Sequence, residues 1–232
     1  MDITGKTALV TGANRGLGRQ LAAQLRDRGA CVYAAARDPQ TVDLVGVTPI
    51  ALDITDPASV AAAAQAATGV AILVNNAGSS TGSSLLTGDL AAIRQEMDTH
   101  FFGTLAVTRA FAPQLAAQGS SAVLNILSAL SWLSVPRSGA YCAAKSAEWS
   151  LTNALRLDLA PQGTRVTALH VGYMDTAMTR HLDVPKSDPA AVAKLAIDGL
   201  EAGDAEIIAD ETSKRVLAGL SAGVAGLYPQ VA

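Results

Sequence analysis

The sequence predicts an α/β protein in which helices flank a doubly wound, parallel β-sheet. Short apolar runs alternate with longer amphipathic stretches through the 232 residues, a pattern typical of parallel strands joined by helical crossovers. Half of the residues are hydrophobic and 16% are charged, which suits strands buried on both faces. A glycine-rich turn follows the first apolar run. Because no repeat or linker-like stretch interrupts the pattern, we expect residues 1–232 to form a single domain.

The elements follow in chain order. We expect strands at residues 7–12, 30–36, 48–53, 69–78, 121–128, 164–172 and 205–209. We expect helices at about 18–29, 57–67, 89–117 and 139–160, and from residue 189 onward. Asp56 and Asp188 are expected N-caps, and each is followed by a proline that fits the first helical position. Gly29 ends the first helix, and Pro161 ends the fourth.

Composition argues against two classes of partner. The net charge is −3 and the 17 basic residues are scattered, so the chain lacks the basic stripe of a nucleic-acid binder. No apolar run approaches the roughly 18 residues of a membrane span, and the first residues lack the layout of a signal peptide. Cys31 and Cys142 are too few for a disulfide framework, and we expect both to be small buried hydrophobes. The expected location is the cytoplasm.

Polar and glycine-rich segments follow the expected strands. In chain order they read TGANRGLG, AARD, LDIT, NNAG, LSAL and HVGYMDT. Ligands of open parallel sheets bind beyond the carboxyl ends of the strands. The sequence therefore predicts one binding site at this edge of the sheet.

The first of these segments predicts a phosphate site. Gly12, Gly16 and Gly18 lie between a strand and a helix, where glycine permits a tight turn and a close approach to the helix N-terminus. Their spacing, G-x-x-x-G-x-G, differs from the commoner G-x-G-x-x-G. An ordinary flexible loop is the alternative interpretation.

Two arginines favour a phosphorylated dinucleotide. An acid about 20 residues after the glycine turn would hold the ribose hydroxyls of NAD, but the second strand ends at Ala36 and Arg37. Arg37 and Arg15 can both bind a 2′-phosphate. We therefore expect NADPH/NADP⁺. Asp38 is the competing signal, because a carboxylate turned inward would repel that phosphate and favour NADH.

The stretch YCAAK places a tyrosine one helical turn before a lysine. Residues i and i+4 share a helix face, so Tyr141 and Lys145 are expected to point the same way. A phenol with its unperturbed pKa of about 10 transfers protons poorly at neutral pH. A nearby ammonium favours the phenolate, so we expect Lys145 to lower the pKa of Tyr141. The alternative is a pair of surface neighbours.

In this order and spacing, TGANRGLG, NNAG and YCAAK resemble the short-chain dehydrogenase/reductase family. The resemblance covers about residues 5 to 180 and implies a single Rossmann domain that binds a nicotinamide dinucleotide. The positions that it and the glycine turn assign to the cofactor are Gly12, Asn14, Arg15, Gly16, Leu17, Gly18, Arg37, Asp53, Ile54, Asn75, Ala77, Gly78, Tyr141, Lys145, Gly172, Met174 and Thr176.

The resemblance also implies individual roles. Asp53 would contact the adenine, and Asn75 and Gly78 would line the cofactor and brace the central strand. Backbone around Gly172 and Met174 would hold the nicotinamide carboxamide, with Thr176 in support. Val171 replaces the proline that usually precedes this glycine.

The catalytic set implied by the resemblance has three familiar members. Tyr141 would be the acid/base, and Lys145 would tune it and bind the nicotinamide ribose. Ser128, thirteen residues before the tyrosine, would stabilise negative charge on the carbonyl oxygen. Ser131 and Ser134 follow closely, which leaves the serine assignment less secure.

His100 is a departure from the family pattern. The family's fourth catalytic group is an asparagine three residues before a glycine, and here His100 precedes Gly103. That asparagine holds a water that relays protons to the lysine. A neutral imidazole both donates and accepts, so we expect His100 to carry the relay; protonated, it would make activity pH-dependent. Alternatively, His100 turns into the helix packing and the relay is lost.

The segments after Ser128 and after the sixth strand are expected to face the substrate. Their candidate residues are Trp132, Leu133, Val135, Tyr173 and Met178, which suggest an apolar or aromatic carbonyl compound, ordinary loop packing being the alternative. The lid between Thr176 and Asp188 is short, which leaves the pocket open. His170 and His181 show no partner pattern for a metal and are interpreted as structural or lid residues.

The overall expectation is an NADPH-dependent carbonyl reductase or alcohol dehydrogenase, a homodimer or homotetramer that pairs through its two long helices. The tail, DETSKRVLAGL, lacks the glycine-rich ending common in the family, which weakens the tetramer more than the dimer. Two alternatives stay open: non-redox biosynthetic chemistry, such as an epimerase or cyclase, and a non-catalytic NADP(H)-binding sensor.

Overall fold

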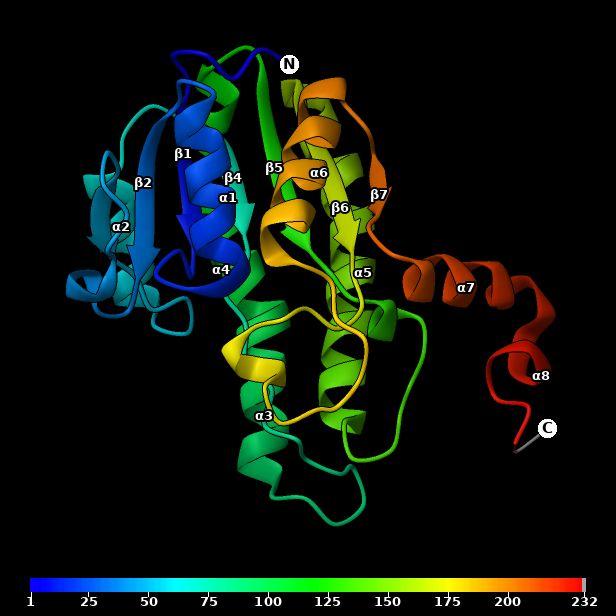
Figure 1. Cartoon of the computed structure of the whole chain (residues 1–232). Helices are drawn as coiled ribbons and strands as arrows, with labels where there is room; N and C mark the ends of the chain where they lie inside the picture. The colour runs from blue at the N-terminus through cyan, green and yellow to red at the C-terminus, as the bar shows by residue number, and fades with distance from the viewer. Residues whose placement is uncertain (231–232) are drawn as a thin grey trace.

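A computed structural model describes residues 1–230 of the chain. Its centre is one seven-stranded parallel sheet with the strand order β3-β2-β1-β4-β5-β6-β7 (Figure 1). The strands are β1 (Thr7–Thr11), β2 (Cys31–Ala36), β3 (Thr48–Ala51), β4 (Val70–Asn75), β5 (Ser121–Ile126), β6 (Thr164–His170) and β7 (Glu206–Ile208). The chain winds outward from β1 to β3, returns beside β1 as β4, and then winds outward the other way. This is the predicted doubly wound order, with its reversal point between β1 and β4.

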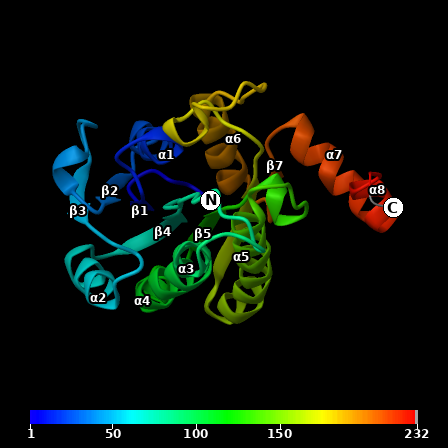
Figure 2. The same cartoon turned by 90° about the horizontal axis from the view of Figure 1, so that it is seen from below.

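Helices cover both faces of the sheet. They are α1 (Gly16–Asp27), α2 (Pro57–Ala66), α3 (Leu90–Met97), α4 (Thr104–Ala117), α5 (Gly139–Leu159), α6 (Pro189–Ala202), α7 (Glu211–Gly219) and α8 (Gly223–Leu227). Figure 2 shows α1 and α6 on one face and α2, α4 and α5 on the other. The predicted caps are present, since the Asp56 carboxylate accepts from the Ala58 N–H and the Asp188 carboxylate from the Ala190 N–H.

Each sheet face has its own core, because successive strand residues point to opposite faces. In β1, Val10 packs in the core under α1 and α6, whereas Leu9 packs in the core under α2, α4 and α5. With both faces covered, every residue of β4 and of β5 is buried. The apolar runs in the sequence are therefore continuous rather than alternating, as expected for a buried parallel sheet.

The helix predicted at 89–117 is interrupted. A π-helical turn, η2 (Asp98–Gly103), lies between α3 and α4. Such a turn fits one additional residue into a helix and often occurs at functional sites. Gly103 ends it against Ile54, whose Cδ1 would lie 2.8 Å from a Cβ at Gly103. The π-turn carries His100 into the molecule, where it is buried.

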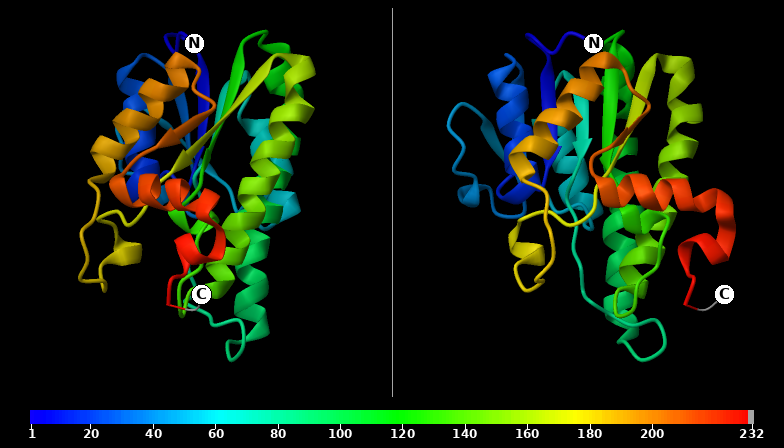
Figure 3. Two further views of the ribbon diagram at one scale, coloured as in Figure 1. Left: turned by 90° about the vertical axis from the view of Figure 1, so that its right-hand side faces the viewer. Right: turned by 45° about the vertical axis from the view of Figure 1, so that its right-hand side comes forward.

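The tail forms two helices that the sequence did not predict. After β7, α7 and α8 run beyond the edge of the sheet and turn down beside the loop that follows β5 (Figure 3). The Asp210 carboxylate caps α7 by accepting from the Ser213 N–H at 2.8 Å. Apolar side chains of the tail, Val216, Leu220 and Leu227, pack in one cluster with Trp132 and Trp149.

Two further observations concern the expectations drawn from composition, namely the burial of the cysteines and the lack of a membrane span. Cys142 is buried as expected, but Cys31 is exposed at the first position of β2, so the prediction that both cysteines are buried is wrong for Cys31. No helix within residues 1–230 is both long and apolar enough to cross a membrane.

Candidate active site

The predicted site lies at the carboxyl edge of the sheet, where the segments after β1 and β4 are bound to each other. The Asn76 amide donates to the Thr11 carbonyl at 2.9 Å, and the Thr11 hydroxyl accepts from the Ala77 N–H at 2.9 Å. The loops after β4, β5 and β6 extend beneath this edge in Figure 1. The NNAG segment and the glycine turn therefore form one rigid wall.

The glycine turn has the shape of a phosphate cradle. Gly12 and Gly16 adopt positive φ values of 64° and 53°, a conformation that glycine enters without strain. A Cβ at Gly18 would collide with the Gly12 carbonyl oxygen. Arg15, the N-cap of α1, makes no side-chain cap within the described residues, which leaves the first helical N–H groups directed at the cleft. These features fit a bound pyrophosphate.

The residues at the end of β2 bear on the choice between NADPH and NADH. The Asp38 carboxylate accepts from the Gln40 N–H at 3.0 Å and caps the short turn at residues 39–41. Arg37 and Arg15 are exposed beside this turn. Asp53 accepts from both the hydroxyl and the N–H of Thr55, and these bonds hold the pKa of its carboxyl below the usual value. The Asp38 carboxylate is thus hydrogen-bonded to the backbone, whereas the guanidinium groups of Arg15 and Arg37 are exposed.

Other predicted cofactor positions differ in what their side chains do. Leu17 and Ile54 point into the two cores, so only their backbone faces the edge. The Asn14 amide donates to the Thr41 hydroxyl at 3.0 Å. The Asn75 amide is buried and donates to Asn125 at 2.8 Å, so it braces the sheet rather than lining the cleft.

Backbone after β6 closes the other side. The Gly172 N–H donates to the Asp210 carboxylate at 2.5 Å, and Met174 pairs with Ser187 at the base of the lid. Thr176 lies opposite the glycine turn, since its Cγ2 would be 3.5 Å from a Cβ at Gly16. A cleft of about 410 Å³ opens here between the start of α1 and the lid.

Tyr141 and Lys145 share one face of α5, as predicted. The Lys145 Nζ lies 5.9 Å from the centre of the Tyr141 ring, and Ser128, at the start of the loop after β5, is buried beside them. The expected net lowering of the phenol pKa is wrong: burial raises the pKa of Tyr141, and the opposing effects of Lys145 and the Ser128 hydroxyl are smaller. The sign of the lysine's effect is as predicted, but desolvation outweighs it.

A carboxylate that the sequence interpretation missed lies against the lysine. The Lys145 Nζ donates to Glu148 Oε2 at 2.6 Å and to the Ile126 carbonyl at 2.8 Å. Burial acts to lower the pKa of Lys145, but Glu148 and the neighbouring Tyr141 outweigh it, and the pKa is raised. Glu148 follows Lys145 by three residues on the same helix face, and that spacing is the signal by which it was detectable.

His100 enters the site between two carboxylates. Its Nε2 is 2.9 Å from the Ser79 carbonyl oxygen and 3.4 Å from Glu96 Oε2. Its Nδ1 is 3.8 Å from Glu148 Oε2. The ring meets Tyr141 edge-on, with 5.2 Å between centroids, and a Cβ at Gly78 would lie 2.9 Å from its Cε1. The imidazole therefore adjoins the tyrosine and lysine.

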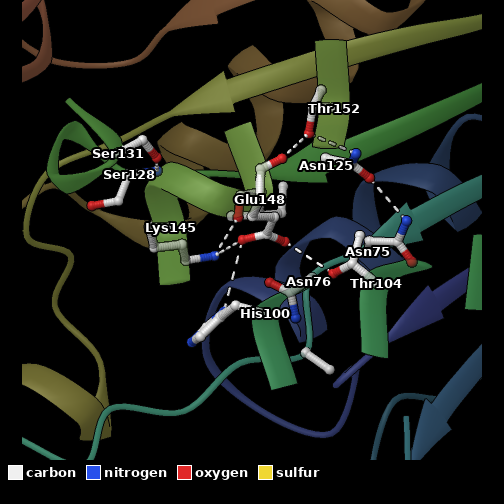
Figure 4. Close-up of polar contacts among 12 residues, drawn as sticks. Asn75, Asn76, His100, Thr104, Asn125, Ser128, Ser131, Lys145, Glu148 and Thr152 are labelled. Carbon is white, nitrogen blue, oxygen red and sulfur yellow. Dashed lines mark hydrogen bonds and ion pairs between the residues drawn. The ribbon is translucent and has the colours of Figure 1, made fainter. Parts of the chain in front are cut away.

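A buried polar network supports these groups from behind (Figure 4). The Asn75 amide also donates to the Thr108 hydroxyl at 3.0 Å, and the Asn125 amide donates to the Thr152 hydroxyl at 2.9 Å. The Thr152 hydroxyl donates to the Glu148 carbonyl. The Thr104 hydroxyl donates to Glu148 Oε1 at 3.0 Å, which leaves Oε2 for the lysine. The network joins β4, β5, α4 and α5.

The candidate substrate residues divide into two groups. Trp132 does not face a substrate: it is buried, stacks on His170 with 3.7 Å between ring centroids, and meets Trp149 edge-on. Tyr173 and Met178 are exposed on the lid. His170 is structural, because its Nδ1 lies 3.4 Å from the Ser128 carbonyl oxygen. Within residues 1–230, no group of three or more His, Cys, Asp or Glu side chains is arranged to hold a metal ion.

Comparison with known proteins gives the family. The model of the short chain dehydrogenase family matches residues 6–186. An uncharacterized oxidoreductase of Staphylococcus saprophyticus is 30% identical, with 87% of this chain and 93% of the relative covered. The D-erythrulose reductase of Gallus gallus is 31% identical over 84% of this chain and 80% of its own length.

Solved structures that resemble this chain support the same family. A short chain dehydrogenase from Burkholderia cenocepacia, in complex with NADP, superposes with a TM-score of 0.94 and 35% identity, covering 100% of this chain and 99% of its own. A short chain dehydrogenase/reductase from Burkholderia phymatum, in complex with NAD, gives a TM-score of 0.86 and 25% identity, covering 95% and 93%. The chain therefore belongs to the short-chain dehydrogenase family of oxidoreductases.

Proposed function

We propose that the protein is an NADPH-dependent oxidoreductase that reduces the ketone of an apolar or aromatic small molecule, or oxidises the corresponding alcohol. The observation that supports this proposal is the convergence of Tyr141, Lys145 and Ser128 beyond the carboxyl edge of the sheet. The three side chains supply a proton donor, a fixed cation and a second hydrogen-bond donor for one oxygen atom.

In this proposal, two residues act directly on the carbonyl oxygen of the substrate, and the third acts on the phenol of Tyr141. The Ser128 hydroxyl and the Tyr141 phenol donate hydrogen bonds to that oxygen and stabilise the negative charge that develops on it. Tyr141 then transfers its proton. A bound nicotinamide would supply the hydride that the carbonyl carbon requires. Lys145 holds a positive charge near the phenol, which opposes the rise in phenol pKa caused by burial.

The preference for NADPH rests on the end of β2. Arg37 and Arg15 are exposed there and can pair with a 2′-phosphate. Asp38 caps a turn through the Gln40 N–H and does not compete. The NADP complex of the Burkholderia cenocepacia relative supports this choice, and the NAD complex of the Burkholderia phymatum relative identifies NADH as the alternative to be measured.

The assembly and location are part of the same proposal. A groove between α4 and α5 is lined by Leu105, Ala112 and Leu155, which suits pairing of two copies through these helices in a homodimer or homotetramer. Both cysteines are free thiols, which fits the reducing cytoplasm. We also propose that residues 1–232 act as one catalytic domain on a small-molecule substrate.

The test is nicotinamide absorbance with a panel of aliphatic and aryl ketones, using the wild type, Tyr141→Phe and Arg37→Ser. We expect turnover with NADPH in the wild type and a loss of at least about 100-fold in Tyr141→Phe, which removes the proton donor. Arg37→Ser should raise the KM for NADPH while leaving that for NADH unchanged. Nucleotide binding without turnover of any ketone would contradict the proposal and favour a sensor.

A further inference from the structure

Strands β6 and β7 leave the sheet side by side, and one carboxylate joins the segments that follow them. The parallel register places His170 opposite Ile208, and the Ala209 N–H donates to the His170 carbonyl at 2.9 Å. Two residues further along each strand, the Asp210 carboxylate accepts from the Gly172 N–H through Oδ2 at 2.5 Å. The pairing of the two strands is thus extended by a bond from a side chain to the backbone.

The same carboxylate begins the first helix of the tail. Its Oδ1 atom accepts from the Ser213 N–H at 2.8 Å, and Asp210 is the N-cap of α7, which follows β7 directly in Figure 1. Each carboxylate oxygen therefore has its own backbone donor. A serine or an asparagine presents only one acceptor oxygen. Neither residue can reproduce both bonds of Asp210 with separate oxygen atoms.

Gly172 allows the carboxylate to lie directly against the backbone. A Cβ at this position would be 3.1 Å from Oδ2 and 3.3 Å from Oδ1 of Asp210. Gly172 does not adopt a positive φ, so the glycine serves the close approach of the carboxylate and not a special turn. On the other side, the Val171 carbonyl accepts from the Ala129 N–H at 3.1 Å. The segment is therefore held by Asp210 and by the loop after β5.

The bond to Asp210 restrains a backbone that lacks a common restraint. Proline fixes its own φ, and the family resemblance implies a proline where this chain has Val171. A valine leaves φ freer, and the bond from the Gly172 N–H to Asp210 limits that freedom. The next fixed point is Met174, which pairs with Ser187 at the base of the lid. The backbone expected to hold the nicotinamide thus lies between two fixed points.

We propose that Asp210 is a positioning residue for the nicotinamide end of the cofactor. This inference rests on the proposed function, because it requires a nicotinamide dinucleotide that binds to the backbone around Gly172 and Met174. In this role Asp210 acts through the Gly172 backbone and needs no contact with the nicotinamide itself. The glycine turn and the end of β2 would bind the other parts of the cofactor, so a change at Asp210 should affect the nicotinamide end alone.

The docked tail in turn holds Asp210 in place. Ser213, whose N–H binds the carboxylate, is fully buried. In the next turn of α7, Val216 packs in one cluster with Trp132, which belongs to the loop after Ser128. The docking of α7 and the order of the Gly172 backbone therefore depend on each other through Asp210. Because such linkage is reciprocal, binding of the nicotinamide should also stabilise the first turn of α7.

The first experiment uses isothermal titration calorimetry to measure the Kd of NADP⁺ and of 2′-phospho-ADP-ribose, which is NADP⁺ without its nicotinamide. The variant is Asp210→Ser, because serine still caps a helix well but cannot reproduce both bonds. We expect the Kd for NADP⁺ to rise about 10-fold, as for the loss of one hydrogen bond to a charged group. The Kd for 2′-phospho-ADP-ribose should stay as in the wild type.

The matched control is Asp89→Ser, which makes the same exchange at the N-cap of α3 and should leave both Kd values unaltered. If Asp210→Ser weakened both ligands equally, the role of Asp210 would be purely structural. If it weakened neither, the carboxylate would play no part in binding. Either result would overturn the inference. Should the wild type bind NAD⁺ better than NADP⁺, the comparison is made with NAD⁺ and ADP-ribose.

The second experiment measures amide hydrogen exchange by NMR and needs no substrate. In the wild type, we expect saturating NADP⁺ to slow exchange at the Ser213 N–H at least about threefold more than saturating 2′-phospho-ADP-ribose does. The difference between the two ligands should disappear in Asp210→Ser. An equal effect of both ligands in the wild type would contradict the inference, and this comparison decides the matter even if the variant fails to fold.

The two experiments separate the inference from the proposed function. A wild type that turns over no ketone, but whose affinity for NADP⁺ alone depends on Asp210, would contradict the proposed function and support the inference. Ketone turnover with NADPH, together with unaltered affinities in Asp210→Ser, would contradict the inference and leave the proposed function intact.

Discussion

The Tyr228 hydroxyl accepts a 2.7 Å hydrogen bond from the backbone N–H of Ser134, 94 residues earlier in the chain. This bond attaches the end of the tail to the loop that follows Ser128. The same loop carries Trp132, which stacks on His170, and His170 in turn contacts the Ser128 backbone. A series of direct contacts thus connects the tail to the serine backbone.

We predict that Tyr228→Phe raises the substrate KM several-fold and lowers the free energy of unfolding by about 1 kcal/mol, the usual net contribution of one hydrogen bond. The change removes the acceptor while keeping the ring. Steady-state kinetics and urea unfolding are the measurements, with Tyr33→Phe on β2 as the control. Unaltered kinetics in Tyr228→Phe would show that the tail does not position the loop.

We predict that His170 makes the protein less stable as the pH falls below 6.5. Burial lowers the pKa of His170 from 6.5 to about 4, and the Ser128 carbonyl and Glu206 only partly oppose this. Between these two values the unfolded chain binds a proton that the folded protein does not, so the free energy of unfolding decreases as the pH falls. The full loss is about 3 kcal/mol, reached near pH 4.

Urea unfolding at several pH values tests this prediction. His170→Gln should flatten the dependence between pH 6.5 and 4, whereas His181→Gln, on the exposed lid, should leave it as in the wild type. An equally steep dependence in His170→Gln would assign the effect to other groups.

We predict that Gly18→Ala strongly weakens nucleotide binding. The added methyl group would collide with the Gly12 carbonyl oxygen, and the turn must shift to accommodate it. Since the first N–H groups of α1 depend on this turn, we expect the Kd for NADPH to rise at least about 100-fold while the sheet stays folded. Tryptophan fluorescence gives the Kd and circular dichroism checks the fold. Wild-type affinity would show that the turn does not bind phosphate.

We predict that Asn125→Ala lowers the free energy of unfolding by about 2 to 6 kcal/mol. The change leaves the Asn75 amide and the Thr152 hydroxyl without one partner each, and each buried unsatisfied group costs about 1 to 3 kcal/mol. Thr152→Val, which removes one arm of the network, should have a smaller effect. Chemical denaturation measures both, and equal losses in the two variants would contradict the assigned connectivity.

The sheet and the edge that carries the site were predictable from the sequence, because burial of parallel strands imposes continuous apolar runs and the polar segments must follow them. The common face of Tyr141 and Lys145 followed from helix periodicity alone. The environment of these two side chains could not be predicted from helix periodicity. The sign of the Tyr141 pKa shift depends on how deeply the phenol is buried, and that depth is set by loops from distant parts of the chain.

The buried carboxylates show the same limit. In the sequence, Glu96 is one charge in an amphipathic stretch and is typical of a solvated helix face. Only the fold brings the Ser79 loop over it and buries it completely. Likewise, Asp38 had two possible orientations, and its bond to the Gln40 N–H selects one of them. The tail helices escaped prediction because their partners, Trp132 and Trp149, belong to other elements.

The π-turn at Asp98–Gly103 makes the site sensitive to the length of the chain at this point. Removing one residue from it would restore an ordinary helix and rotate everything before it by roughly 100° relative to α4. Glu96 would then swing out toward water while Thr104 kept its place. A single-codon deletion between residues 98 and 103 would accordingly separate Glu96 from the lysine and glutamate of α5 by moving the whole of α3, without exchanging any side chain of α4 or α5.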